Sequence, residues 1–270
     1  MNQLLARFSA DRLPTSNRWW ILLGVGLFVF FLLRQIPATW GAYALTRGTG
    51  LALSGITGTL WEGRASLASV RLPQGQEQSL GQLSWDLNPL SLLLLKPCAD
   101  IATKLDRQSF TGYVCASSNG SLRVSDADLS MPIALVQSML PIPVNGQLLV
   151  HIDELQLRGN VLGKLNGNLS WNGAQVNNGA NWMDVGNYAA QLKDDGSNGV
   201  LAKVFQLSGP VELDLTVELK APSGGRVHGQ LLMDKAFVDA SNAAGLLAMI
   251  AQPGEADPNG KSRYQVDMSL

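Results

Sequence analysis

Hydrophobic and polar residues follow two different patterns along this chain. From Trp19 to Leu33, no residue carries a charge or a strong hydrogen-bonding side chain. Beyond residue 50, apolar and polar residues alternate with period two, and short breaks rich in glycine separate the alternating runs. That alternation is typical of β-strands joined by hairpins. The sequence therefore predicts one N-terminal helix followed by a mainly β region.

The apolar run is short for a transmembrane helix, because a hydrocarbon core about 30 Å thick needs roughly 20 residues. Its flanks supply the missing length. An ideal helix from Trp20 to Trp40 would rise about 30 Å and place an aromatic side chain at each interface. Arg34 would lie near the far boundary, where a long side chain reaches the headgroups. Residues 19–40 are thus predicted to be a transmembrane anchor.

A cleaved secretory signal is the competing interpretation, since Ala42-Tyr43-Ala44 is an acceptable cleavage site. The long segment before the apolar run favours the uncleaved anchor. Arg7, Arg12 and Arg18 precede the run, so the positive-inside rule keeps the N-terminus in the cytoplasm. Either interpretation sends residues 45–270 across the membrane.

The exported part is predicted to be an antiparallel sheet, because the connections are too short for crossover helices. Leu90–Leu95 is too apolar to assign by periodicity, and a short buried helix or a core strand both fit. Ile133–Leu140 and Ala240–Ala251 are expected to be short helices. The later strands are expected at Ala99–Leu105, Phe110–Ala116, Ser121–Leu129, Gly146–Leu157, Gly163–Trp171, Val200–Leu207, Val211–Leu219 and Arg226–Phe237.

A weak internal repeat runs through this region. Gly81-Gln82-Leu83-Ser84-Trp85 is echoed by Gly167-Asn168-Leu169-Ser170-Trp171. One interpretation is chance similarity among strands. The other is two related sub-sheets, 51–140 and 141–270, that extend each other into one curved sheet with an apolar concave face and exposed edges.

Composition removes several classes of function. Charged residues are 15% of the chain and the net charge is −1, which gives no footprint for nucleic acid. The two histidines, His151 and His228, both lie in alternating strands, and no nucleophile, phosphate-loop or metal motif occurs. We therefore expect no enzyme, no metal site and no cofactor.

In the absence of catalytic motifs, the cysteines and three of the tryptophans are the side chains to which the sequence assigns a structural role. Cys98 and Cys115 are expected to form a disulfide in an oxidising compartment, the alternative being two buried free thiols. Trp61, Trp85 and Trp171 are expected to be core aromatics of the sheet. The alternative places them in a wall that faces a ligand or partner.

Two blocks of the sequence stand out, Gly55–Ala65 (GITGTLWEGRA) and Leu80–Leu93 (LGQLSWDLNPLSLL). Together they resemble the front half of type II secretion system protein N. The order of parts is also similar: a short basic tail, one anchor and a glycine-rich β domain. The motif positions that carry the resemblance are Gly55, Gly58, Thr59, Trp61, Gly63, Leu83, Trp85, Leu87 and Pro89.

The resemblance implies an accessory inner-membrane component of the machine that exports folded proteins from the periplasm of Gram-negative bacteria. Residues 1–18 would be a cytoplasmic tail, 19–40 the anchor, 41–50 a linker and 51–270 a periplasmic domain. Its partners would be the inner membrane and other envelope proteins of the secretion system. A looser likeness to AsmA-type envelope proteins implies an alternative function, lipid binding or lipid bridging by the concave face.

Overall fold

A computed structural model describes residues 17–47, 50–71, 77–140, 142–159, 161–220, 224–241, 243–255, 257 and 260–269. Nearly all of the expected cytoplasmic tail lies outside these residues. The helices are α1 (Asn17–Arg34), α2 (Ala38–Thr46), α3 (Pro89–Leu93), α4 (Lys235–Ser241), α5 (Ala244–Ile250) and the 3-10 helix η1 (Ile133–Met139). The strands are β1 (Leu51–Gly58), β2 (Glu62–Arg71), β3 (Glu77–Leu87), β4 (Cys98–Leu105), β5 (Gln108–Ala116), β6 (Ser121–Pro132), β7 (Val144–Arg158), β8 (Val161–Asn177), β9 (Trp182–Asp194), β10 (Gly199–Ser208), β11 (Val211–Lys220), β12 (Gly225–Met233), β13 (Gln252–Pro253) and β14 (Ser262–Ser269).

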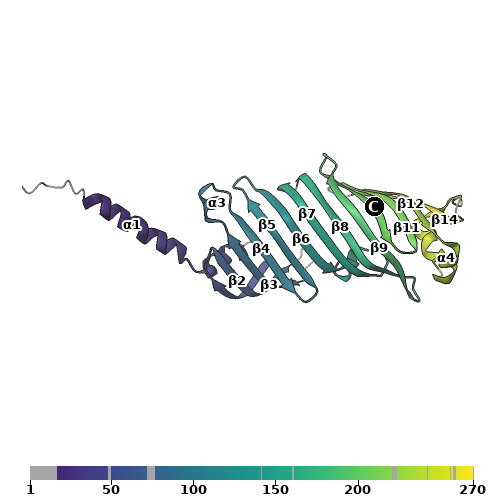
Figure 1. The fold of residues 1–270 in the computed structure, drawn as a ribbon, viewed down its shortest axis with the longest axis horizontal. Coiled ribbons are helices and arrows are strands. Elements are labelled where there is room, and N and C mark those ends of the chain that lie inside the picture. Colours follow the sequence, from purple (N-terminus) through teal and green to yellow (C-terminus); the bar gives the residue numbers. More distant parts are fainter. Residues whose placement is uncertain are drawn as a thin grey trace, which may run out of the picture.

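The strands form one antiparallel sheet whose spatial order follows the chain from β1 to β12. β14 then pairs with β12, and the two-residue β13 lies outside β14. The sheet is long and curved, α1 projects from its β1 end and α4 lies at the opposite end (Figure 1). The expected mainly β fold with one antiparallel sheet is confirmed.

The two faces of the sheet differ in polarity because side chains alternate along each strand. Cross-strand register places Phe110, Leu129, Val150 and Leu169 in one row on the concave face. The adjacent row, on the convex face, consists of Thr111, Asp128, His151 and Asn168. The period-two pattern of the sequence thus corresponds to an apolar inner face and a polar outer face.

The main hydrophobic core lies where helices cover the concave face near the end of the chain. Val238 of α4 and Leu247 of α5 are buried in one cluster with residues of β8, β9, β11, β12 and β14. Tyr188 of β9 lies in this cluster, its hydroxyl donates to the carbonyl oxygen of Val211 at 3.2 Å, and burial raises its pKa. A smaller cluster holds η1 against β7 through Ile133, Val144 and Leu148. Helices therefore cover the concave face of the later strands, those nearer the C-terminus of the chain.

Several elements differ from the sequence-based prediction. No strand was expected over β9, although it pairs along most of its length with β8 and β10. The predicted strand Arg226–Phe237 ends at Met233, and the predicted helix Ala240–Ala251 is two helices, α4 and α5. Leu90–Leu95 was expected to be buried in either interpretation. A short helix, α3, does form there, but the expected burial is wrong for Leu90, Leu94 and Leu95, whose side chains are exposed.

The N-terminal helices have opposite environments. The apolar side chains of α1 from Trp19 to Leu33 are exposed, whereas Ala38 and Ala42 of α2 are buried where α2 packs beside β1. α2 therefore starts within the expected anchor and runs into the expected linker. Among the helices described here, none is both long enough and apolar enough to cross a membrane.

Candidate functional site at the α1 end of the sheet

The C-terminal end of α1 is hydrogen-bonded to the turn between β1 and β2. The indole nitrogen of Trp61 donates to the carbonyl oxygen of Leu33 at 2.7 Å. The backbone nitrogen of Leu60 donates to the carbonyl oxygen of Ile36 at 2.8 Å. The last carbonyl groups of a helix have no partner within the helix, so such donors fix how the chain leaves it. Trp61 thus ties α1 to the sheet.

The turn that carries Trp61 is built by its neighbours in the motif. The backbone nitrogen of Thr59 donates to the carbonyl oxygen of Glu62 at 2.8 Å, and the Thr59 hydroxyl accepts from the nitrogen of Glu62 at 3.2 Å. Gly58 has a φ of +96°, and a Cβ there would lie 2.5 Å from the Glu62 carbonyl oxygen. Only glycine fits both the conformation and the space at this position.

Trp85 packs directly on Gly63, its cross-strand partner on β2. A Cβ at Gly63 would lie 2.2 Å from the nearest ring carbon of Trp85. The indole nitrogen of Trp85 donates to the carbonyl oxygen of Leu60 at 3.1 Å. The two tryptophans therefore fix the same turn on two sides. Trp61 bonds the turn to α1, and Trp85 bonds it to β3 of the sheet.

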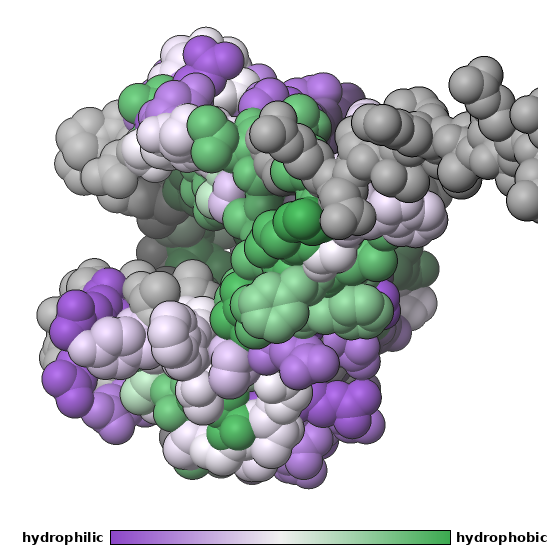
Figure 2. All heavy atoms as spheres, turned by 90° about the vertical axis from the view of Figure 1, so that its left-hand side faces the viewer, coloured by the Kyte–Doolittle hydropathy of each residue, from purple (hydrophilic) through white to green (hydrophobic). Residues whose placement is uncertain are grey.

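An apolar trough opens on the concave face beside this turn, with a cavity volume of about 820 Å³. The motif residues Leu83, Trp85 and Leu87 contribute side chains to its wall. Viewed from the α1 end, the molecule is hollowed, and hydrophobic residues gather on the inner side of the hollow (Figure 2). The remaining wall comes from α2, β1, β4, β5, β6 and η1 and includes Ala42, Leu53, Ile101, Phe110, Val114, Leu129, Met131 and Val136.

The α3 loop, Asn88–Lys96, follows the last of these motif strands. The Asn88 side chain caps α3 by accepting from the backbone nitrogen of Leu90 at 3.1 Å, and Pro89 occupies the first turn. The hydroxyl of buried Ser91 donates to the Asn88 carbonyl oxygen at 2.6 Å and accepts from the nitrogen of Cys98 at 2.9 Å. Side-chain hydrogen bonds thus fix this short loop at both its ends.

Cys98 and Cys115 are joined by a disulfide between β4 and β5, directly after this loop. They are register partners with a Cα–Cα distance of 4.0 Å. Their neighbours Pro97 and Ala116 share a backbone hydrogen bond, so the cysteines occupy a non-hydrogen-bonded pair, in which side chains approach most closely. The disulfide lies on the convex face, opposite the trough.

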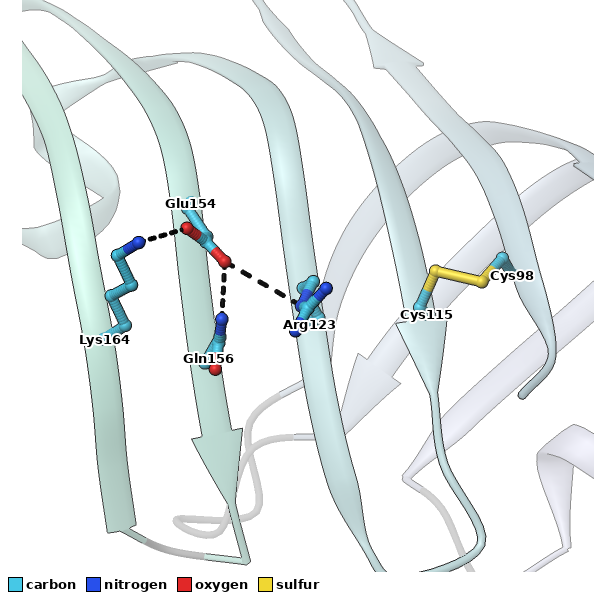
Figure 3. A network of polar contacts seen from close by, with 6 residues as sticks. All are labelled: Cys98, Cys115, Arg123, Glu154, Gln156 and Lys164. Atoms are coloured by element: carbon cyan, nitrogen blue, oxygen red, sulfur yellow. Dashed lines mark hydrogen bonds and ion pairs between the residues drawn. A yellow bond between two sulfur atoms is a disulfide. The ribbon is translucent and has the colours of Figure 1, made fainter. Parts of the chain in front are cut away.

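Register carries the same convex row onward to Arg123, Gln156 and Lys164. Glu154 accepts from Lys164 at 2.6 Å and lies 3.8 Å from Arg123, with Gln156 as a further donor (Figure 3). The hydrogen bond from Lys164 is the main reason why the pKa of Glu154 is lowered. Arg123 and Lys164 are exposed and Glu154 is half-buried, so these are ion pairs at the surface, and such pairs contribute little to stability.

His151 lies between two carboxylates, those of Asp128 and Asp153. Its Nδ1 lies 2.7 Å from Asp128 and its Nε2 lies 3.4 Å from Asp153. The hydrogen bond with Asp128 is the largest influence that raises the pKa of His151. Within the described part of the chain, no group of three or more His, Cys, Asp or Glu side chains is arranged to hold a metal ion.

The structure brings most of the motif positions together at this turn. Trp171, which was expected to be a core aromatic with Trp61 and Trp85, lies in a different part of the sheet. Gly58, Thr59, Trp61, Gly63 and Trp85 build one turn, and Gly55 adjoins it on β1, where its carbonyl oxygen accepts from the Ser66 hydroxyl at 3.3 Å. Trp171 lies on the concave face against Tyr188, with ring centroids 5.9 Å apart. Its indole nitrogen donates to the Asn145 carbonyl oxygen at 3.0 Å.

Sequence reasoning missed Leu60 and Ser91 as organising residues. The backbone of Leu60 donates to Ile36 and accepts from Trp85, and its side chain lines the trough. The two backbone roles cannot be recognised from the type of side chain. Ser91 did leave a signal, because it is the one hydroxyl residue inside an otherwise apolar run. A serine in that setting is expected to bond the local backbone.

A family model for type II secretion system protein N matches residues 49–264. The chain belongs to this family. Relatives named type II secretion system protein N include one from Aeromonas hydrophila, 33% identical over 61% of this chain, and one from Vibrio cholerae serotype O1, 34% identical over 56% of it. The matched stretches cover 66% and 61% of those relatives' own lengths. No solved structure matches the chain.

All nine motif positions lie within the stretch matched by the protein N family, and α1 lies before it. The family-matched region therefore comprises the sheet up to the first residues of β14, the α3 loop and most of the trough wall, but not the part of that wall that α2 supplies.

Proposed function

We propose that this member of the protein N family is an accessory inner-membrane component of the type II secretion system. Residues 19–40 anchor it, the N-terminus is cytoplasmic and residues 51–270 form a periplasmic domain that meets other envelope components. The observation that carries the proposal is the join at Trp61, which couples an exposed apolar helix to one end of a long sheet. Such a sheet extends a docking surface away from the membrane.

The length of α1 bears on this anchor. Its 18 residues would span about 27 Å, slightly less than a hydrocarbon core of about 30 Å. A short apolar stretch is accommodated by local thinning of the bilayer and by snorkelling of flanking side chains such as Arg34. Trp20 and Trp40 are both more than 70% exposed and have the chemistry of interfacial anchors.

Docking of secretion partners would use the exposed edges and polar convex face of the domain. β1 forms one edge of the sheet, and an edge strand can pair with an extended segment of another protein. Among the residues that the structure describes, we find no side-chain arrangement on either face that suggests a reaction, and we propose a structural role rather than a catalytic one.

A deletion strain tests the proposal. Loss of the protein should leave folded exoproteins in the periplasm, and wild-type protein supplied from a plasmid should return them to the medium. Phe28→Glu, in the middle of α1, should release the protein from membranes on alkaline extraction and fail to restore secretion. Leu207→Glu, which charges an exposed leucine of β10, is the matched control. Normal secretion in the deletion strain together with altered envelope permeability would refute the proposal.

Lipid binding is the second candidate function, and the trough favours it. Its volume of about 820 Å³ lies within the range of roughly 300–1,000 Å³ of small-molecule sites, and its wall is almost wholly apolar. η1 and the core under α4 and α5 fill the concave face further along, so the trough suits a bound acyl chain better than a through-passage.

A tryptophan scan distinguishes this candidate. Ala99→Trp and Thr103→Trp place bulk in the trough, whereas Lys104→Trp places the same side chain on the convex face of the same strand. If the trough holds lipid, the first two variants should lose co-purifying phospholipid and the third should retain it. Equal phospholipid in all three would rule the trough out as the site.

A further inference from the structure

We propose that the α3 loop, Asn88–Lys96, is a membrane-docking element that inserts leucine side chains into the headgroup–acyl boundary of a lipid bilayer. The inference rests on the proposed anchor, which places the bilayer at the α1 end of the sheet. It assigns a role to a motif that the proposed function leaves without one. Through this contact the domain would be held at the bilayer at a second point, separate from α1.

Exposed leucines of the loop form an apolar patch. The exposed fractions are 69% for Leu90, 73% for Leu94 and 71% for Leu95. Single exposed apolar residues are normal on protein surfaces, but a contiguous patch marks an interaction site. Three such leucines within six residues, at the tip of a connection between strands, therefore need a partner.

The loop is built to present these side chains. Buried Ser91 bonds the backbone on both sides, and the backbone nitrogen of Lys96 donates to the Ser91 carbonyl oxygen at 3.0 Å. Leu95 has a φ of 54°, a left-handed conformation that is uncommon for residues other than glycine. Strained conformations persist where the surrounding structure determines them, and they cluster at functional sites. Collapse of the leucines onto the sheet is thus prevented by the loop's own hydrogen bonds.

The chemistry of the loop fits a bilayer. Lys96 is the only charged residue between Leu87 and Ala99, and it is exposed beside Leu95. A lysine at the rim of an apolar patch is attracted to anionic headgroups while the leucines enter the acyl boundary. No carboxylate lies in this stretch to oppose that contact.

Position selects the bilayer over a soluble partner. α3 lies at the end of the sheet from which α1 projects (Figure 1). α2 packs beside β1 at the same end, and its Trp40 is 73% exposed and its Tyr43 is also exposed. Tryptophan and tyrosine are enriched at membrane–water interfaces. An anchor that inserts at this end therefore brings the membrane surface to the loop.

The test uses single cysteines in the full-length chain, because the disulfide leaves neither native cysteine free for labelling. Leu94→Cys reports on the loop, and Ser118→Cys reports on the adjacent polar turn between β5 and β6, which is exposed on the same rim. Phe28→Cys reports separately on the anchor. Each variant carries the fluorophore NBD in vesicles of phosphatidylethanolamine and phosphatidylglycerol, and iodide serves as the aqueous quencher.

We expect the quenching constant at Leu94 to be lower than that at Ser118 by about threefold or more, since a leucine at the acyl boundary is shielded from aqueous ions. Equal quenching at these two positions, strong or weak, would overturn the docking role. Strong quenching at Phe28 would instead refute the anchor, which separates the two failures. If Leu94 is protected in native membranes but not in these vesicles, a protein covers the loop and the assignment to lipid is wrong.

Discussion

The contact between Gly63 and Trp85 permits a sharp test of the motif turn. Changing Gly63 to alanine places a Cβ at 2.2, 2.6 and 2.8 Å from three carbons of the indole six-membered ring. Favourable carbon contacts lie at about 3.5–4.0 Å, so the ring must move by more than 1 Å. Overpacking of this kind costs about 1–3 kcal/mol. The displacement would also stretch the Trp85 hydrogen bond to Leu60, worth about 1 kcal/mol.

A double-mutant cycle shows whether this clash is the cause. Trp85→Phe removes the ring atoms that an alanine would meet, and alone it should destabilise the domain by about 1–2 kcal/mol through the lost hydrogen bond and contact area. The double variant, Gly63→Ala with Trp85→Phe, should then be more stable than the sum of the single effects by about 1–2 kcal/mol. Gly163→Ala is the matched control, because its Cβ would meet nothing closer than 3.5 Å.

The free energy of unfolding would be measured by urea titration of the full-length protein in detergent, without reductant, followed by circular dichroism in the β-sheet region. Additive effects within about 0.5 kcal/mol would show that Gly63 and Trp85 do not interact as described. A neutral Gly63→Ala would refute the clash itself.

Three further predictions concern the disulfide, the Trp61 hydrogen bond to α1 and the ion pairs of His151. Replacing Cys98 and Cys115 by serine should lower the free energy of unfolding by about 2–4 kcal/mol, and added reductant should lower wild-type stability but not that of the variant. Trp61→Phe should weaken the join to α1 by about 1 kcal/mol, seen as faster hydrogen exchange of the Leu60 amide with the sheet unchanged. The pKa of His151 in the folded protein is raised above 6.5, so the His151 ion pairs stabilise the fold below pH 6.5, and this stabilisation is lost as pH rises through the folded pKa. The effect on the free energy of unfolding should be below about 1 kcal/mol, because the pair is exposed. Urea titrations at pH 6 and pH 8 should show this pH dependence in the wild type and not in His151→Gln.

Alternation of apolar and polar residues was enough to predict most of the sheet, because nearly every strand has one face toward the concave side. β9 escaped detection for a local reason. Its register shifts against β8 and against β10, and Gly186 and the pair Ala189-Ala190 interrupt the period-two pattern. A bulge moves side chains to the opposite face, so a strand that contains one loses its periodicity in the sequence.

The candidate site was only partly predictable. Composition shows that the leucines of Asn88–Lys96 are apolar but says nothing about exposure, which depends on the capping by Asn88 and the bonds of Ser91. The three tryptophans have similar sequence surroundings and different roles. Trp61 meets α1, Trp85 lines the trough and Trp171 adjoins the main core, because each position depends on strands distant in the chain.

The sequential strand order has a consequence for how the domain could fold while the chain is being made. Each strand from β2 to β12 pairs with the strand made just before it, so contacts stay local along the chain, and local contacts favour fast folding. A chain that emerges N-terminus first could add one strand at a time to a growing edge. Growth would stop at β13, whose two residues include Pro253, because proline has no backbone N–H to offer to a further strand.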